Sequence, residues 1–119
     1  MRMAKKSRRG ERLKAPESSY TDPHGSVLVL RGALTAATRS QYAAELGGNV
    51  LSRDDAWQRA VEFLFERLAV RWEIAGAEAL TRQKQLLGRY RLASADERRW
   101  IRGVLREHLA ANFPDMQAP

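Results

Sequence analysis

Apolar residues recur at intervals of three and four along most of the chain, a pattern that predicts α-helices. The strongest example spans residues 53–75, where the repeating apolar positions are Trp57, Ala60, Val61, Leu64, Leu68 and Trp72. Phe63, Phe65 and Val70 widen this surface beyond a single stripe. A helix that is apolar on more than one side must be covered from more than one side, so we expect residues 53–75 to form the central helix.

Capping residues indicate three further helices. Thr35 is a suitable N-cap for a helix that runs through Leu46 to a stop at Gly47-Gly48. A third helix is expected over about 80–91. Ser94 and Glu97 have the spacing of a capping box, which predicts the start of the last helix.

One short run does not follow the helical period. Residues 26–32, SVLVLRG, are typical of a buried strand, but a lone strand needs a partner. Residues 70–74, VRWEI, alternate at period two and offer a rival strand. Residues 26–32 could equally be an extended segment packed across helices, or a strand that pairs with a second copy of the chain. We therefore predict a mainly α fold, a small bundle of about four helices with one short extended segment.

The length and composition of the 119 residues predict one folded domain between two unstructured termini. Residues 1–25 are basic and then small and polar, with almost no apolar side chains to offset the entropy of ordering. We expect a disordered basic N-terminal arm over 1–25, with a turn at 21–25 leading into a helical domain over 26–113. Residues 114–119 are expected to be a frayed C-terminus.

The absence of cysteine excludes disulfides, thiolate catalysis and Cys-based zinc sites. The longest apolar stretch near the start, Val27-Leu28-Val29-Leu30, is too short for a membrane span or a signal peptide. These features predict a soluble, cytoplasmic protein without membrane association.

The formal charge of +7 is concentrated in two blocks. Residues 1–14 carry seven basic side chains against Glu11, a charge of +6. Residues 82–106 carry eight basic side chains against Asp96 and Glu97, again +6. The rest of the chain is net negative, so this asymmetry says more about partners than the total charge does.

The two basic blocks favour association with nucleic acid, DNA or RNA, because Lys and Arg can neutralise phosphates and release counterions. In the arm the candidate residues are Arg2, Lys5, Lys6, Arg8, Arg9, Arg12 and Lys14. On the last helix Arg98, Arg102 and Arg106, with Arg99, fall within about 100° of one another. The leading hypothesis is a non-enzymatic intracellular protein that binds nucleic acid through backbone electrostatics.

Simpler interpretations exist for the same charges. Glu62 and Glu66 lie four residues apart on the central helix and are available to pair with these arginines, or the arginines are merely solvated. Residues 83–105 also suggest a helix-turn-helix unit, although its turn contains no glycine.

The wide apolar surface of residues 53–75 supports an alternative function from another class. It predicts a helical interaction or adaptor protein, with homodimer formation covering this surface and with an incidental basic arm. The aromatic residues Trp57, Phe63, Phe65 and Trp72 also resemble a base-stacking platform or the wall of a small-ligand pocket. At helical spacing, such residues more often belong to the core.

Enzymatic sites have little support. The chain contains no HExxH, P-loop, GxGxxG or GxSxG pattern. His24 lies in the expected turn, and His108 lies on the apolar stripe of the last helix, where a histidine is usually a satisfied core residue. We therefore predict no catalytic residue, no metal site and no cofactor.

Overall fold

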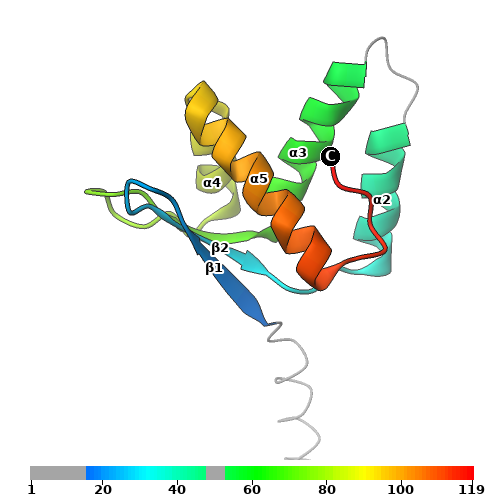
Figure 1. Cartoon of the computed structure of the whole chain (residues 1–119), viewed down its shortest axis with the longest axis horizontal. Helices are drawn as coiled ribbons and strands as arrows, with labels where there is room; N and C mark the ends of the chain where they lie inside the picture. Colours follow the sequence, from blue (N-terminus) through cyan, green and yellow to red (C-terminus); the bar gives the residue numbers. More distant parts are fainter. Residues whose placement is uncertain (1–15, 48–52) are drawn as a thin grey trace, which may run out of the picture.

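The computed structural model describes residues 16–47 and 53–119 (Figure 1). Within this part of the chain the order is β1 (Glu17–Thr21), β2 (Val27–Arg31), α2 (Ala36–Gly47), α3 (Arg53–Leu68), β3 (Ala69–Glu73), α4 (Gln83–Arg91) and α5 (Ala95–Asn112). The strands form one antiparallel sheet in the order β1-β2-β3. The fold is therefore α+β, and the prediction of a mainly α bundle is wrong.

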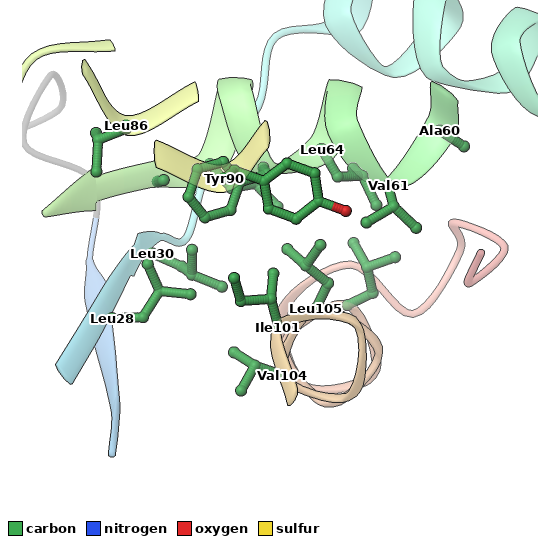
Figure 2. Close-up of a cluster of buried hydrophobic side chains, with 14 of the residues drawn as sticks. Leu28, Leu30, Ala60, Val61, Leu64, Leu86, Tyr90, Ile101, Val104 and Leu105 are labelled. Carbon is green, nitrogen blue, oxygen red and sulfur yellow. The ribbon is translucent and has the colours of Figure 1, made fainter. Parts of the chain in front are cut away.

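The central strand β2 places the core between the sheet and the helices. Leu28 and Leu30 are fully buried, whereas Val27 and Val29 on the other face are half-buried, as the period of two in a strand requires. Figure 2 shows Leu28 and Leu30 directed into the same cluster as Ile101 of α5 and the side chains of α3. Each fully buried leucine stabilises the fold by about 1.5–3 kcal/mol.

The predicted central helix over 53–75 is too long. It ends at Leu68, and the chain continues without a loop into β3. Trp72 lies four residues after Leu68, and a spacing of four keeps side chains on the same face both in a helix and in a strand. The apolar stripe therefore continued across the junction although the backbone changed. Residues 70–74, the rival strand in the sequence, supply the partner that β2 needs, with Leu28 opposite Trp72.

The expectation of a disordered arm over 1–25 is wrong for its last part, because residues 17–21 form β1 and pair with β2. The predicted turn closes this hairpin. The Asp22 carboxylate accepts hydrogen bonds from the backbone N–H groups of His24 and Ser26, at 2.8 and 2.9 Å. Gly25 has a φ of +89°, a conformation that favours glycine. Backbone pairing and this turn stabilise a strand that has few apolar side chains.

The C-terminal residues 114–119, predicted to be frayed, pack against the body of the protein. The Tyr42 hydroxyl donates a hydrogen bond of 2.5 Å to the Gln117 carbonyl. Met116 and Ala118 lie against the core, and Pro119 is buried. These contacts are long-range in sequence, so local composition did not indicate them.

The starts of two helices agree with the predicted capping residues. The Thr35 hydroxyl accepts from the Thr38 N–H at 3.1 Å at the start of α2, and the predicted capping box opens α5. Helix α4 begins at Gln83 rather than near residue 80, because the Leu80 backbone pairs with Trp72. Of the helices within the described ranges, none combines the length and apolarity needed to cross a membrane.

Candidate nucleic-acid interface

The predicted nucleic-acid contacts divide into two groups. The seven arm residues, Arg2, Lys5, Lys6, Arg8, Arg9, Arg12 and Lys14, lie outside the described residues. Arg98, Arg102 and Arg106 lie on α5, as expected, and Arg98 and Arg106 are exposed. The structure therefore describes the environment of only the second basic block.

Arg98 is held against α4. Its guanidinium donates to the Arg91 carbonyl at 2.6 Å and lies 5.5 Å from the centre of the Tyr90 ring. A guanidinium has five N–H donors, so this bond leaves most of them available for another acceptor. Arg98 is thus positioned by the fold and keeps its charge for a ligand.

Arg102 is half-buried and lies over Trp57 of α3, with 4.1 Å between the guanidinium carbon and the ring centre. This cation–π contact is attractive and fixes the mutual orientation of the two side chains. Its Nε is buried and has no hydrogen-bond acceptor in the described part of the chain. Arg102 therefore stacks on an aromatic ring instead of pairing with a carboxylate.

Other basic residues of residues 82–106 do pair with acids. Arg91 bonds to Glu62, the partner that the simpler interpretation proposed. Arg89 bonds to Glu97 at 2.6 Å, and Arg99 bonds to Asp96 at 3.0 Å. Partial burial raises the pKa of Glu97, but its hydrogen bonds from Ser94 and Arg89 outweigh that effect and lower the pKa. These pairs neutralise part of the block, and both side chains of the Arg99 pair are exposed.

A cleft of about 420 Å³ lies between α3 and α5. Its lining residues are Asp54, Trp57, Gln58, Val61, Tyr90, Ala95, Arg98, Arg99 and Arg102. Three guanidiniums face one carboxylate, Asp54, so the wall is basic. Burial raises the pKa of the Tyr90 hydroxyl, although Arg98 and Arg102 act in the opposite direction. The cleft therefore joins positive charge to an aromatic surface.

Sequence reasoning assigned Trp57 to the core and did not consider Gln58. Trp57 is 36% exposed, whereas Trp72 and Phe65 are buried in the core. The ring centres of Trp72 and Phe65 lie 5.6 Å apart. Trp57 lies near the start of the predicted apolar stripe, where a helix end can extend past its core. Its position near the helix start was the one feature of the sequence that could have indicated the exposure of Trp57. Of the two tryptophans proposed to line a small-ligand pocket, Trp57 lines this cleft, whereas Trp72 is buried in the core.

His108 is a satisfied core residue, as predicted. It is fully buried, with its Nε2 2.8 Å from the Arg31 carbonyl and its Nδ1 2.8 Å from the Tyr20 hydroxyl. These partners fit a neutral ring in which Nε2 donates and Nδ1 accepts. Burial lowers the pKa of His108, and the bond to Arg31 opposes this shift. The histidine therefore joins α5 to the sheet.

The described residues contain no group of three or more His, Cys, Asp or Glu side chains arranged to hold a metal ion. The polar groups that line the cleft are the guanidiniums of Arg98, Arg99 and Arg102, the indole of Trp57, the amide of Gln58, the carboxylate of Asp54 and the hydroxyl of Tyr90. No protein-family model, curated protein or solved structure matches this chain, so this geometry alone supports an assignment of function.

Proposed function

We propose that this protein binds nucleic acid without acting as an enzyme, chiefly through contacts between its arginines and lysines and the phosphate backbone. The observation that carries this proposal is the placement of Arg98, Arg99 and Arg102 along one cleft, whose lining contains one carboxylate, Asp54, while Arg99 is also paired with Asp96 at its exposed edge. Such an array attracts anions and makes contacts that do not depend on base sequence. The basic residues of the arm would extend the same electrostatic contact.

The alternative function, an adaptor or homodimer that uses the apolar surface of residues 53–75, is favoured less. Phe65 is fully buried, and Phe63 and Val70 are half-buried within the chain. In the described ranges, the large hydrophobic residues classed as exposed are Trp57 and Leu92. The surface that motivated this hypothesis is thus mostly covered by the chain itself.

A helix-turn-helix function over 83–105 also has less support than backbone binding. The three-residue connection between α4 and α5 suits such a unit. However, Arg98 and Arg102 lie against the rings of Tyr90 and Trp57, and do not project freely from α5. A recognition helix needs free side chains at its start to contact base edges.

The salt dependence of binding tests the proposal. We expect the affinity of the full chain for a labelled oligonucleotide to fall steeply between about 50 and 200 mM salt. A variant with both Arg98→Gln and Arg99→Gln removes two arginines of the cleft and should lose two phosphate contacts. The slope of log K against log salt concentration should then fall by about 1.4 for a single strand or 1.8 for a duplex. Fluorescence anisotropy measures both quantities.

Arg71→Gln is the matched control, because Arg71 is an exposed arginine of β3 that pairs with Glu73 and does not line the cleft. The slope of log K against log salt concentration for this variant should equal that of the unmodified chain. A second variant, with the seven basic residues of 1–14 changed to Gln, separates the contribution of the arm. An affinity that stays constant across the salt range would contradict the proposed function.

A further inference from the structure

Within the proposed nucleic-acid function, on which this inference rests, we propose that the cleft between α3 and α5 binds one unpaired nucleotide of a single strand. The cleft of about 420 Å³ lies within the range of about 300–1,000 Å³ that is usual for small-ligand sites. It combines a basic wall with Trp57 and the amide of Gln58. These groups match the three parts of a nucleotide that a protein can recognise: phosphate, base face and base edge.

The Trp57–Arg102 pair supplies the stacking surface. The guanidinium of Arg102 covers one face of the Trp57 ring at 4.1 Å, so a base would stack on the outer plane of the guanidinium or on the opposite face of the indole. Trp57 keeps 36% of its surface exposed, although the other tryptophans are more buried. The Nε of Arg102 is buried and has no acceptor in the described part of the chain, so contacts of Arg102 with a ligand are left to its terminal N–H groups.

The remaining arginines suit the phosphate. Arg98 is anchored by a single bond to the Arg91 carbonyl and has further donors. The ion pair of Arg99 with Asp96 has side-chain exposures of 76% and 90%. Such an exposed pair contributes little stability, so Arg99 can exchange Asp96 for a phosphate readily. Arg98 and Arg99 are therefore available at the same cleft without disruption of the core.

The stacking surface favours an unpaired base. In a duplex both faces of each base are covered by its neighbours, so Trp57 and Arg102 can stack only on a base that has left the helix. The amide of Gln58 can both donate and accept, which suits a base edge that is not engaged in pairing. A site that used phosphates alone would need neither Trp57 nor Gln58.

Trp57 also lines a second cleft, of about 880 Å³, whose charged residues are Arg39, Arg53 and Asp115. An indole shared by two clefts that both contain arginines lies on a path for a strand, with phosphates contacted on either side of the stacked base. This arrangement favours a nucleotide within a strand over a free mononucleotide.

Fluorescence titration of the full chain tests the inference. The probes are an oligothymidylate of about 12 nucleotides, a duplex of equal length, and thymidine monophosphate at the same salt concentration. We expect the single strand to bind more tightly than the duplex and to change the tryptophan emission. Trp57→Ala should weaken single-strand binding about 5- to 150-fold, the range for one stacked base, and change duplex binding less than about twofold.

Trp57→Tyr keeps an aromatic face and should restore most of the affinity, which separates stacking from a loss of structure. The thermal unfolding of each variant checks that it is folded. Equal affinity for single strand and duplex, unchanged by Trp57→Ala, would overturn this inference and leave the proposed function intact. Absence of binding to either nucleic acid would contradict the function itself. Mononucleotide binding as tight as that of the oligomer would overturn the assignment to a strand.

Discussion

Tyr20 and His108 connect the first strand to the last helix through side chains. The edge-to-face contact of their rings, with centres 5.7 Å apart, accompanies the hydrogen bond between the Tyr20 hydroxyl and Nδ1. The second ring nitrogen bonds to the Arg31 carbonyl at the end of β2. A protonated His108 would carry a hydrogen on Nδ1 and could not accept from Tyr20 there. The hydrogen bonds of the folded protein therefore fit the neutral ring, in agreement with the pKa of His108 being lowered by burial.

Stability should depend on the ionisation of His108. Its pKa in the folded protein is lowered by burial, so below about pH 6.5 the unfolded chain binds the proton more readily. This contribution to the free energy of unfolding is present above that pH. It is lost as the pH falls towards the folded pKa, by at most about 1.4 kcal/mol per pH unit. Urea unfolding between about pH 7.5 and 5.5 measures the loss.

His108→Gln keeps a polar side chain but cannot titrate in this range. We expect this variant to be less stable at neutral pH and to lose less stability on acidification. His24→Gln, in the exposed hairpin turn, is the control and should follow the unmodified chain. If the free energy of unfolding had the same pH dependence in the unmodified chain and the His108 variant, His108 would not be the group responsible.

At the scale of elements, α5 is the helix that local sequence specifies best. Ser94 accepts from the Glu97 N–H at 3.1 Å, and the Glu97 carboxylate accepts from the Ser94 N–H at 2.9 Å. Glu97 also accepts from Arg89, so the same carboxylate joins α4 to α5. The capping box thus fixes both the start of the helix and the turn that precedes it.

Removing the cap by Ser94→Ala should lower the free energy of unfolding by about 1 kcal/mol, because backbone donors at the helix start lose their acceptor. The melting temperature should fall by roughly 4 °C. Ser40→Ala, on the exposed surface of α2, is a suitable control and should change stability by less than about 0.5 kcal/mol. Differential scanning calorimetry of the two variants gives the comparison, and equal melting temperatures would count against the cap.

The elements that sequence predicted well are those determined locally. The starts of α2 and α5 follow from capping residues, and β2 follows from its branched apolar run. The end of α3 was mispredicted because the spacing from Leu68 to Trp72 satisfies both a helix and a strand. β1 was missed because its stability comes from pairing with β2, which its own polar sequence does not indicate.

The same distinction applies to the candidate site. Helical geometry alone places Arg98 and Arg102 on one face of α5, so sequence could propose them. Their shared cleft with Trp57 depends on how α3 and α5 pack, a relation between residues about 40 positions apart that no local pattern encodes. The pairing of Arg91 with Glu62 likewise joins residues far apart in the sequence, whereas Arg99 pairs with Asp96 on the same helix.

Across the whole molecule, the C-terminal residues close the side of the fold formed by α2. Phe113 is buried beneath Arg39, whose guanidinium lies 5.2 Å from the ring centre. Four residues later, the Gln117 carbonyl accepts from Tyr42, whose hydroxyl pKa is raised strongly by burial. The Phe113 ring and the Gln117 carbonyl thus add to the core contacts of Met116 and Ala118 in holding a segment that has little secondary structure.

Tyr42→Phe removes this hydrogen bond and should lower the free energy of unfolding by about 1 kcal/mol. We also expect residues 114–119 to become more sensitive to carboxypeptidase, because their attachment to α2 is weakened. Tyr20→Phe loses a comparable bond on β1 and should leave the digestion rate unchanged. Mass spectrometry of timed digests distinguishes the two variants, and equal rates would show that Tyr42 does not hold the segment.

The direct junction of α3 with β3 restricts how the length of the chain can vary. Successive side chains of a strand point to opposite faces, so one residue inserted between Leu68 and Ala69 would turn Trp72 towards solvent and Arg71 towards the core. Two inserted residues would preserve the facing of every side chain in β3. We therefore expect a two-residue insertion at this junction to disturb the packing of β3 less than a one-residue insertion, which needs a β-bulge to keep Trp72 in the core.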